Sequence, residues 1–313
     1  MSELYNVTSS PHIRAKDSTQ RIMLYVIIAL LPATVFGIIN FGPRALAVVV
    51  VSIASCLVSE YLYNKIAHKK QTIGDLSCVV TGLLLGLNLS HTVPFFIPII
   101  GGAFAIVVVK MIFGGLGQNF MNPALGARCF LLLAFTGPMT SFTFDGVSGA
   151  TPLAVIKDGA LYSDTMAMFT GRIAGTIGET SVIALLIGAI FLILLGVIDL
   201  RIPGTYIITF VIFIVLFGGH LGSSDLGQFV VQEVCGGGLI LGAFFMATDY
   251  VTSPITPKGK IIYGIICGCL LGIFRMFGAS AEGCSYSIIF ANMLVPLIER
   301  FTIPKPFGKG GEK

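Results

Sequence analysis

The run "IMLYVIIALLPATVFGIIN" at residues 22–40 contains no charged side chain. An α-helix rises about 1.5 Å per residue, so a run of this length crosses the roughly 30 Å of hydrocarbon in a bilayer. Arg14, Lys16 and Arg21 precede it, as basic residues precede the core of a signal peptide. The apolar run is too long for such a core and lacks a clear small-x-small cleavage site. We therefore expect a retained transmembrane helix.

Similar runs recur along the whole chain of 313 residues. Hydrophobic residues make up 55% of the sequence and charged residues 11%, with a mean hydropathy of +0.93. Soluble domains average about 25% charged residues. The sequence thus predicts an all-α polytopic membrane protein with about ten transmembrane helices. The expected spans are 22–40, 45–64, 76–91, 95–113, 123–137, 181–199, 203–218, 234–248, 261–277 and 285–299.

The basic residues indicate topology rather than a partner. The net charge of +4 is spread over short connecting segments, without the basic stripe interleaved with aromatics that nucleic acid would require. Cytoplasmic loops are rich in Lys and Arg. With both termini in the cytoplasm, only Arg44, Lys157 and Arg172 fall outside. This orientation predicts a multi-pass membrane protein with both termini in the cytoplasm and residues 138–180 on the extracytoplasmic side.

The two halves of the chain resemble each other at corresponding places. "GLLLG" at residues 82–86 matches "GLILG" at 238–242, and "KMIFGG" at 110–115 matches "RMFGAS" at 275–280. Each pair lies five expected spans apart, and an odd number of spans reverses the direction of the second copy. Two inverted five-helix repeats are one explanation, and chance similarity between glycine-rich segments is the other. The division expected is a cytoplasmic segment 1–21, a first repeat 22–137, a loop 138–180, a second repeat 181–300 and a tail 301–313.

The stretch "KMIFGGLGQNFMNPALGAR", residues 110–128, interrupts the helical pattern after the fourth expected span. Gly114, Gly115 and Gly117 break a continuous helix, and Pro123 suits the first turn of the next one. Irregular backbone at membrane depth is tolerated where it is buried in protein or lines a cavity. We therefore expect a break that faces the interior of the protein.

Two asparagines and two basic residues of this stretch are candidates for a role. Asn119 and Asn122 each offer a donor and an acceptor, so they either cap the broken backbone or bind the polar edge of a planar heterocycle. Lys110 and Arg128 flank the break near the inner face, where we expect long basic side chains to extend along lipid toward water.

Other reactive residues indicate no further site. The seven cysteines contain no CxxC pair, and the four histidines are scattered, so we expect no disulfide framework, metal site or catalytic triad. Glu60, Asp199 and Asp249 fall near the ends of expected spans. The sequence therefore predicts no ion path within this chain alone.

A small polar motif, "DGVSGAT" at residues 145–151, lies in the expected extracytoplasmic loop. Its glycines are typical of turns. A turn does not account for a threonine hydroxyl beside two small residues, which leave room for a bulky group to reach the oxygen. Because no histidine-aspartate relay accompanies Thr151, an attachment point is a better interpretation than a nucleophile.

"DGVSGAT" resembles the flavinylation signature of proteins that carry FMN in phosphoester linkage to the last threonine. "FGGLGQNFMNPALGAR" is similar to the matching stretch of the NqrB/RnfD family of membrane redox subunits, and the resemblance covers essentially the whole chain. The short N-terminal segment resembles the Rnf branch of the family. Rnf complexes move electrons between ferredoxin and NAD and export sodium or protons. The resemblance implies a subunit that is inactive alone, with Rnf subunits A, B, C, E and G and a flavin transferase as partners.

The resemblance also assigns roles to single residues. Thr151 would carry covalent FMN, and Asp145, Ser148, Gly149 and Ala150 would complete the signature. Asn119 and Asn122 match positions that hold a second, non-covalent flavin, riboflavin, in the quinone-reductase relatives, where Gly114 and Gly115 match a glycine pair linked to quinone. Two alternatives stay open: a solute channel or transporter with inverted repeats, and a quinone-reducing subunit.

Overall fold

The computed structural model describes residues 18–144, 147–221, 224–278 and 282–304. Asp145 of the expected flavinylation signature lies outside the described residues, as do positions 1–17 and 305–313 of the two terminal segments. Most of the described residues are helical, and the regular structure besides the helices is one two-stranded hairpin, which is consistent with the expected all-α class.

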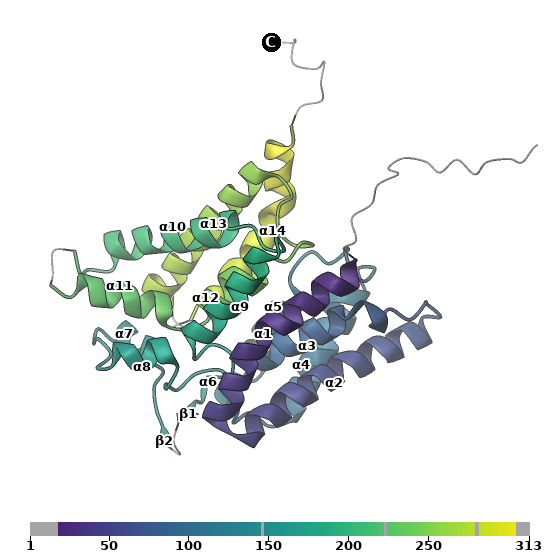
Figure 1. Cartoon of the computed structure of the whole chain (residues 1–313), viewed down its shortest axis with the longest axis horizontal. Helices are drawn as coiled ribbons and strands as arrows, with labels where there is room; N and C mark the ends of the chain where they lie inside the picture. Colours follow the sequence, from purple (N-terminus) through teal and green to yellow (C-terminus); the bar gives the residue numbers. More distant parts are fainter. Residues whose placement is uncertain (1–17, 145–146, 222–223, 279–281, 305–313) are drawn as a thin grey trace, which may run out of the picture.

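The first half of the chain contains five helical segments, drawn in purple to blue in Figure 1. Gly42, at φ +78°, ends the first helix by donating its N–H to Ile38, and Pro43 begins the second. The 3₁₀ turn Ile73–Asp75 precedes the third. The segments are α1 Thr19–Phe41, α2 Pro43–Ile66, α3 Ser77–Leu87, α4 Phe96–Ala103 with its continuation as a π-helix, Phe104–Met111, and α5 Pro123–Ala134.

The second half also contains five helical segments, drawn in green to yellow. They are α9 Val182–Leu194, α10 Arg201–Phe217, the pair α11 Leu226–Cys235 and α12 Leu239–Leu241 with its π-helical continuation Gly242–Met246, α13 Pro257–Phe277, and α14 Cys284–Thr302. The break between α11 and α12 bends the pair by 59°. Each half therefore contains one π-helical segment, a local distortion that is frequent at functional sites.

All ten expected spans overlap a helix, but their lengths differ from the expectation. Three helices, α1, α2 and α13, are long and apolar enough to cross a membrane, and the bent α11–α12 pair would be a fourth. The helices α3 and α5 have 11 and 12 residues, so each is only about 16–18 Å long. The runs 76–91 and 123–137 thus form short helices completed by non-helical chain, because Asn88 and Phe135 end them early.

The segment between the halves is folded rather than an open loop. It contains α6 Thr136–Thr140, the antiparallel strands β1 Thr143–Phe144 and β2 Val147–Ser148, α7 Pro152–Lys157 and α8 Thr165–Thr170. In Figure 1 these elements lie at the end of the molecule opposite the two ends of the described chain.

Close packing joins the halves. Helix α1 packs on α9, and α5 packs on α14. At Gly188 of α9, an added Cβ would lie 1.9 Å from the carbonyl oxygen of Ala29 in α1. Small residues let membrane helices approach this closely. Gly188 therefore permits the close contact between α1 and α9.

Candidate functional site

A cavity of about 300 Å³ lies at the end of the molecule formed by the segment between the halves. Its volume is at the lower end of the range for small-molecule sites, which are mostly apolar with a few polar groups. Met139, Phe142, Leu153 and Ile173 provide apolar walls, and Thr151 lies on the wall with them. Its charged lining residues are Arg128, Glu179 and Glu282.

Thr151 is positioned by the start of α7. It is the N-cap residue, with φ −65° and ψ 153°, and its Oγ1 accepts a long hydrogen bond of 3.3 Å from the Ala154 N–H. Pro152 begins the helix and fixes the approach of the chain. An ester oxygen at this position would still accept the capping hydrogen bond. The cap therefore does not conflict with a group attached to Oγ1.

The rest of the motif leaves Thr151 accessible. Gly149 and Ala150 are exposed and line the same cavity, and an added Cβ at Gly149 would have no neighbour within 4 Å. The backbone of Ser148 pairs with Thr143 in the hairpin. A large group can thus reach the threonine oxygen along this exposed edge.

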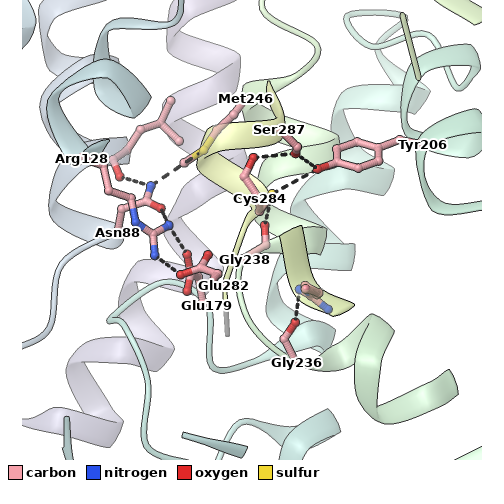
Figure 2. A network of polar contacts seen from close by, with 12 residues as sticks. Asn88, Arg128, Glu179, Tyr206, Gly236, Gly238, Met246, Glu282, Cys284 and Ser287 are labelled. Atoms are coloured by element: carbon pink, nitrogen blue, oxygen red, sulfur yellow. Dashed lines mark hydrogen bonds and ion pairs between the residues drawn. The ribbon is translucent and has the colours of Figure 1, made fainter. Parts of the chain in front are cut away.

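Arg128 is the least exposed of the charged side chains that line the cavity. Figure 2 shows its guanidinium between Asn88 and two glutamates that come from different elements. Nη1 donates to Glu179 Oε1 at 2.6 Å and also to Asn88 Oδ1, while Nη2 donates to Glu282 Oε2. Asn88 ends α3, Arg128 belongs to α5, Glu179 precedes α9 and Glu282 precedes α14. The cluster therefore ties both halves of the chain together.

The expectation that Arg128 faces lipid is wrong. Arg128 is 3% exposed, and its acidic partners lie 51 and 154 positions away in the sequence. A guanidinium inside an apolar bundle is stable only when it is paired, and Arg forms such paired contacts well because its donors are fixed in a planar fork.

The same expectation is wrong for Lys110, which lies on the π-helix Phe104–Met111 and is 2% exposed. Its Nζ lies 2.7 Å from Glu60 Oε2 and 2.6 Å from Ser77 Oγ, and Thr72 donates to Glu60 Oε1 at 2.6 Å. The position near a helix end that was expected for Glu60 is correct, but the side chain is fully buried.

Arg275 of α13 holds the break between α11 and α12. It pairs with Glu233 at 2.9 Å and also donates to the main-chain carbonyls of Glu233 and Gly236. Its guanidinium lies 5.0 Å from the centre of the Phe210 ring. Arg275 thus satisfies carbonyls that the end of a helix leaves without partners.

The second predicted site, around Asn119 and Asn122, lies at the opposite end of α9. A cavity of about 90 Å³ contains both asparagines and Lys110 in its lining, together with Leu192 in the last turn of α9. Asn122 caps α5 through hydrogen bonds from Ala124 and Leu125 and also donates to Met246, which confirms the capping interpretation for this residue. A cavity of this volume has room for a few water molecules rather than for a tricyclic flavin ring.

The glycines of this break have a backbone role. Gly114, Gly115 and Gly117 have φ values of +123°, +98° and +93°, a region that favours glycine. Pro123 is the first residue of α5, as the sequence predicts. Asn119 donates to the Met121 carbonyl at 3.0 Å, so both asparagines stabilise the irregular chain.

The sequence reasoning missed the acidic residues of the clusters. Glu179, Glu233 and Glu282 are distant from Thr151 and from one another in the sequence and match no motif. One signal could have found them. Charged side chains are rare in so apolar a chain, and ionisable residues in membrane segments usually face the protein interior and pair with one another.

The fold and its sites define a helical membrane protein with buried ion pairs and a ligand-sized cavity at one end. The sequence profile of the NQR2, RnfD, RnfE family matches residues 6–308, and the chain belongs to this family. It is 49% identical to the D subunit of the Na⁺-translocating ferredoxin:NAD⁺ oxidoreductase complex of Acetobacterium woodii, over 98% of this chain and 97% of that protein. It is 40% identical to the proton-translocating counterpart of Clostridium ljungdahlii, over 97% of this chain and 96% of that protein.

Proposed function

We propose that this chain is the D subunit of an ion-translocating ferredoxin:NAD⁺ oxidoreductase complex and carries FMN as a phosphoester on Thr151. The names of the relatives support the complex. The observation that carries the flavin site is the position of Thr151, the last residue of "DGVSGAT", on the wall of the ligand-sized cavity.

The residues around the cavity fit a flavin. Phe142, Met139 and Leu153 offer an apolar surface to a planar ring, and Arg128 with its two glutamates offers the few polar contacts that fix orientation. FMN supplies redox chemistry when bound, and the protein supplies position and electrostatics. Thr151 would hold the phosphate, the walls would exclude water from the ring, and the exposed edge at Gly149 and Ala150 would admit the transferase.

For the whole chain we propose two inverted five-helix repeats that cross the membrane ten times. When two repeats are related by a two-fold axis, a helix of one repeat that lies next to the axis packs against the equivalent helix of the other repeat. The contacts α1 with α9 and α5 with α14 join the first and fifth segments of each half to their counterparts, which supports the proposal. Lys110 and Arg275, at matching positions of the two halves, are both buried and paired with a glutamate.

We propose the cytoplasmic membrane as the location, with both termini inside and Thr151 outside. The distribution of basic residues supports this orientation. The other proteins of the complex would supply and accept electrons. The relatives differ in the coupling ion, since one is named for sodium and another for protons.

The residues around Asn119 and Asn122 do not fit a second flavin. The cavity beside them is too small for a flavin ring, and the side chains of both asparagines are bound to the protein itself. Gly114 and Gly115, which the resemblance links to quinone, have a sufficient structural reason in their positive φ values.

The test is flavin fluorescence of the denatured chain in a gel, with Thr151→Ala compared with Thr140→Ala. Thr140 is another threonine that lines the cavity, so it is a matched control. Wild type and Thr140→Ala should fluoresce, and Thr151→Ala should not, although it assembles in the complex. Fluorescence that persists in Thr151→Ala would refute the attachment site.

A further inference from the structure

Two carboxylates share one guanidinium under the cavity. Arg128 is bonded to Glu179 and Glu282 at once, and the exposed fractions of the three side chains are 4%, 5% and 24%. The carboxylates also approach each other. A Cβ placed on Gly238 would lie 2.5 Å from Glu179 Oε1 and 2.7 Å from Glu282 Oε1, so both oxygens converge on one point of the main chain.

The basic side chains near Glu179 and Glu282 do not balance the charges of these two carboxylates. Arg275 is the nearest other guanidinium, and it is paired with Glu233. Arg128 alone therefore faces the two carboxyl groups of Glu179 and Glu282, so this group of three side chains contains one more carboxyl group than guanidinium. Lys157 of α7 interacts electrostatically with Glu233 and Asp158 from the protein surface. Other described polar and titratable groups that face the pair are Asn88, Cys129, Thr176, Cys284 and Tyr286.

Burying an uncompensated charge is unfavourable, and binding a proton removes that charge. When two carboxyl groups occupy one site, the proton-binding affinity of one of them rises strongly. The proton then belongs to the pair rather than to one residue.

We propose that Glu179 and Glu282 hold one shared proton on their Oε1 atoms and exchange it with the occupant of the cavity under Thr151. The identity of that occupant as a flavin rests on the proposed function, whereas the shared proton does not. FMN, when bound, would supply redox chemistry whose reduction consumes a proton, and the carboxyl pair would be the protein group that provides it. On release, the pair is left with a second carboxylate, which Arg128 neutralises in part, and the proton is replaced from bulk water on the side of the more exposed Glu282 side chain.

The pH range of this site follows from burial. Glu179 lies outside the helices, just before α9, and burial raises its pKa to about 7 against the opposing effect of Arg128. Because the pKa is raised, the proton is present below this pH and is lost as the pH rises through it.

The test is infrared spectroscopy of the purified complex, which detects the C=O stretch of a protonated carboxylic acid by its shift in D₂O. We compare wild type with Glu179→Gln, Glu282→Gln and the control Glu299→Gln, whose carboxylate accepts a hydrogen bond from Ile255 elsewhere in the fold. Each cluster variant should lose the band of one carboxylic acid, because the remaining carboxylate has the Arg128 guanidinium to itself and no second carboxyl group with which to share a proton. The control should keep it. In wild type, which needs no variant to fold, the band should disappear as the pH rises through about 7.

Absence of the band from wild type at low pH would overturn the shared proton. Loss of the band in only one of the two glutamine variants would assign the proton to a single carboxyl group and overturn the sharing. Thr151→Ala separates this inference from the proposed function. The band should persist there but no longer respond to chemical reduction, and an unchanged redox response would overturn the exchange. A covalent flavin retained by this variant would refute the attachment site without affecting the shared proton.

Discussion

Replacing Lys110 with methionine tests whether this lysine is part of a buried ion pair. Its ammonium group forms hydrogen bonds to Glu60 and Ser77 at 2.7 and 2.6 Å, and Glu60 is fully buried. Methionine keeps the length of the side chain but leaves the Glu60 carboxylate with Thr72 as its remaining hydrogen-bond donor among those described. Removing one partner of a buried pair costs about 3–5 kcal/mol. A lipid-facing lysine would cost about 0.5 kcal/mol or less.

The assay is unfolding of the detergent-solubilised protein, followed for Lys110→Met, Glu60→Gln, the double variant and the control Lys70→Met. Lys70 is exposed, so its replacement should change the free energy of unfolding by less than about 0.5 kcal/mol. The double variant should recover most of the loss, because it leaves no unpaired charge. A loss in Lys110→Met no larger than that in Lys70→Met would refute the buried pair.

Three further predictions concern packing, recognition and topology. Gly188→Leu should reduce the yield of folded protein, measured by size-exclusion chromatography, because the new Cβ would lie 1.9 Å from the Ala29 carbonyl oxygen. The control Gly204→Ala should leave the yield unchanged, because a Cβ at that position has no neighbour within 4 Å. Gly149→Ala should fold normally, since the new Cβ would have no neighbour within 4 Å, but it should lose in-gel flavin fluorescence because the transferase recognises the glycine. Full fluorescence would show that the transferase does not recognise it. A cysteine at the exposed position Ala160 should react with an impermeant thiol reagent outside intact cells while one at Lys70 should not, and the reverse labelling would overturn the orientation.

The apolar runs of the sequence were sufficient to predict the helices but not their lengths. A run such as 22–40 is apolar throughout, so its helical state and extent follow from composition. The runs 76–91 and 123–137 are also long and mostly apolar, but their helices end at Leu87 and Ala134. Those ends depend on contacts with distant segments: Asn88 accepts a hydrogen bond from Arg128, which lies 40 positions away.

The candidate site was predictable where a local pattern encodes it. Pro123 and the glycines before it predict the break at residues 110–128. Thr151 is the last residue of a recognisable motif. The partners of Arg128 and Lys110 were not predictable, because ion pairs between residues 50 or more positions apart depend on how the helices pack. Near a span end, lipid-facing and buried basic residues follow the same local pattern.

The most direct test of the proposed function is the mass of the proteolytic peptide that contains Thr151, from the complex purified under native conditions. The proposal predicts a peptide heavier by one FMN less one water, with fragmentation that places the added mass on Thr151. An unmodified Thr151 peptide, recovered from complex that transfers electrons between ferredoxin and NAD⁺, would contradict it.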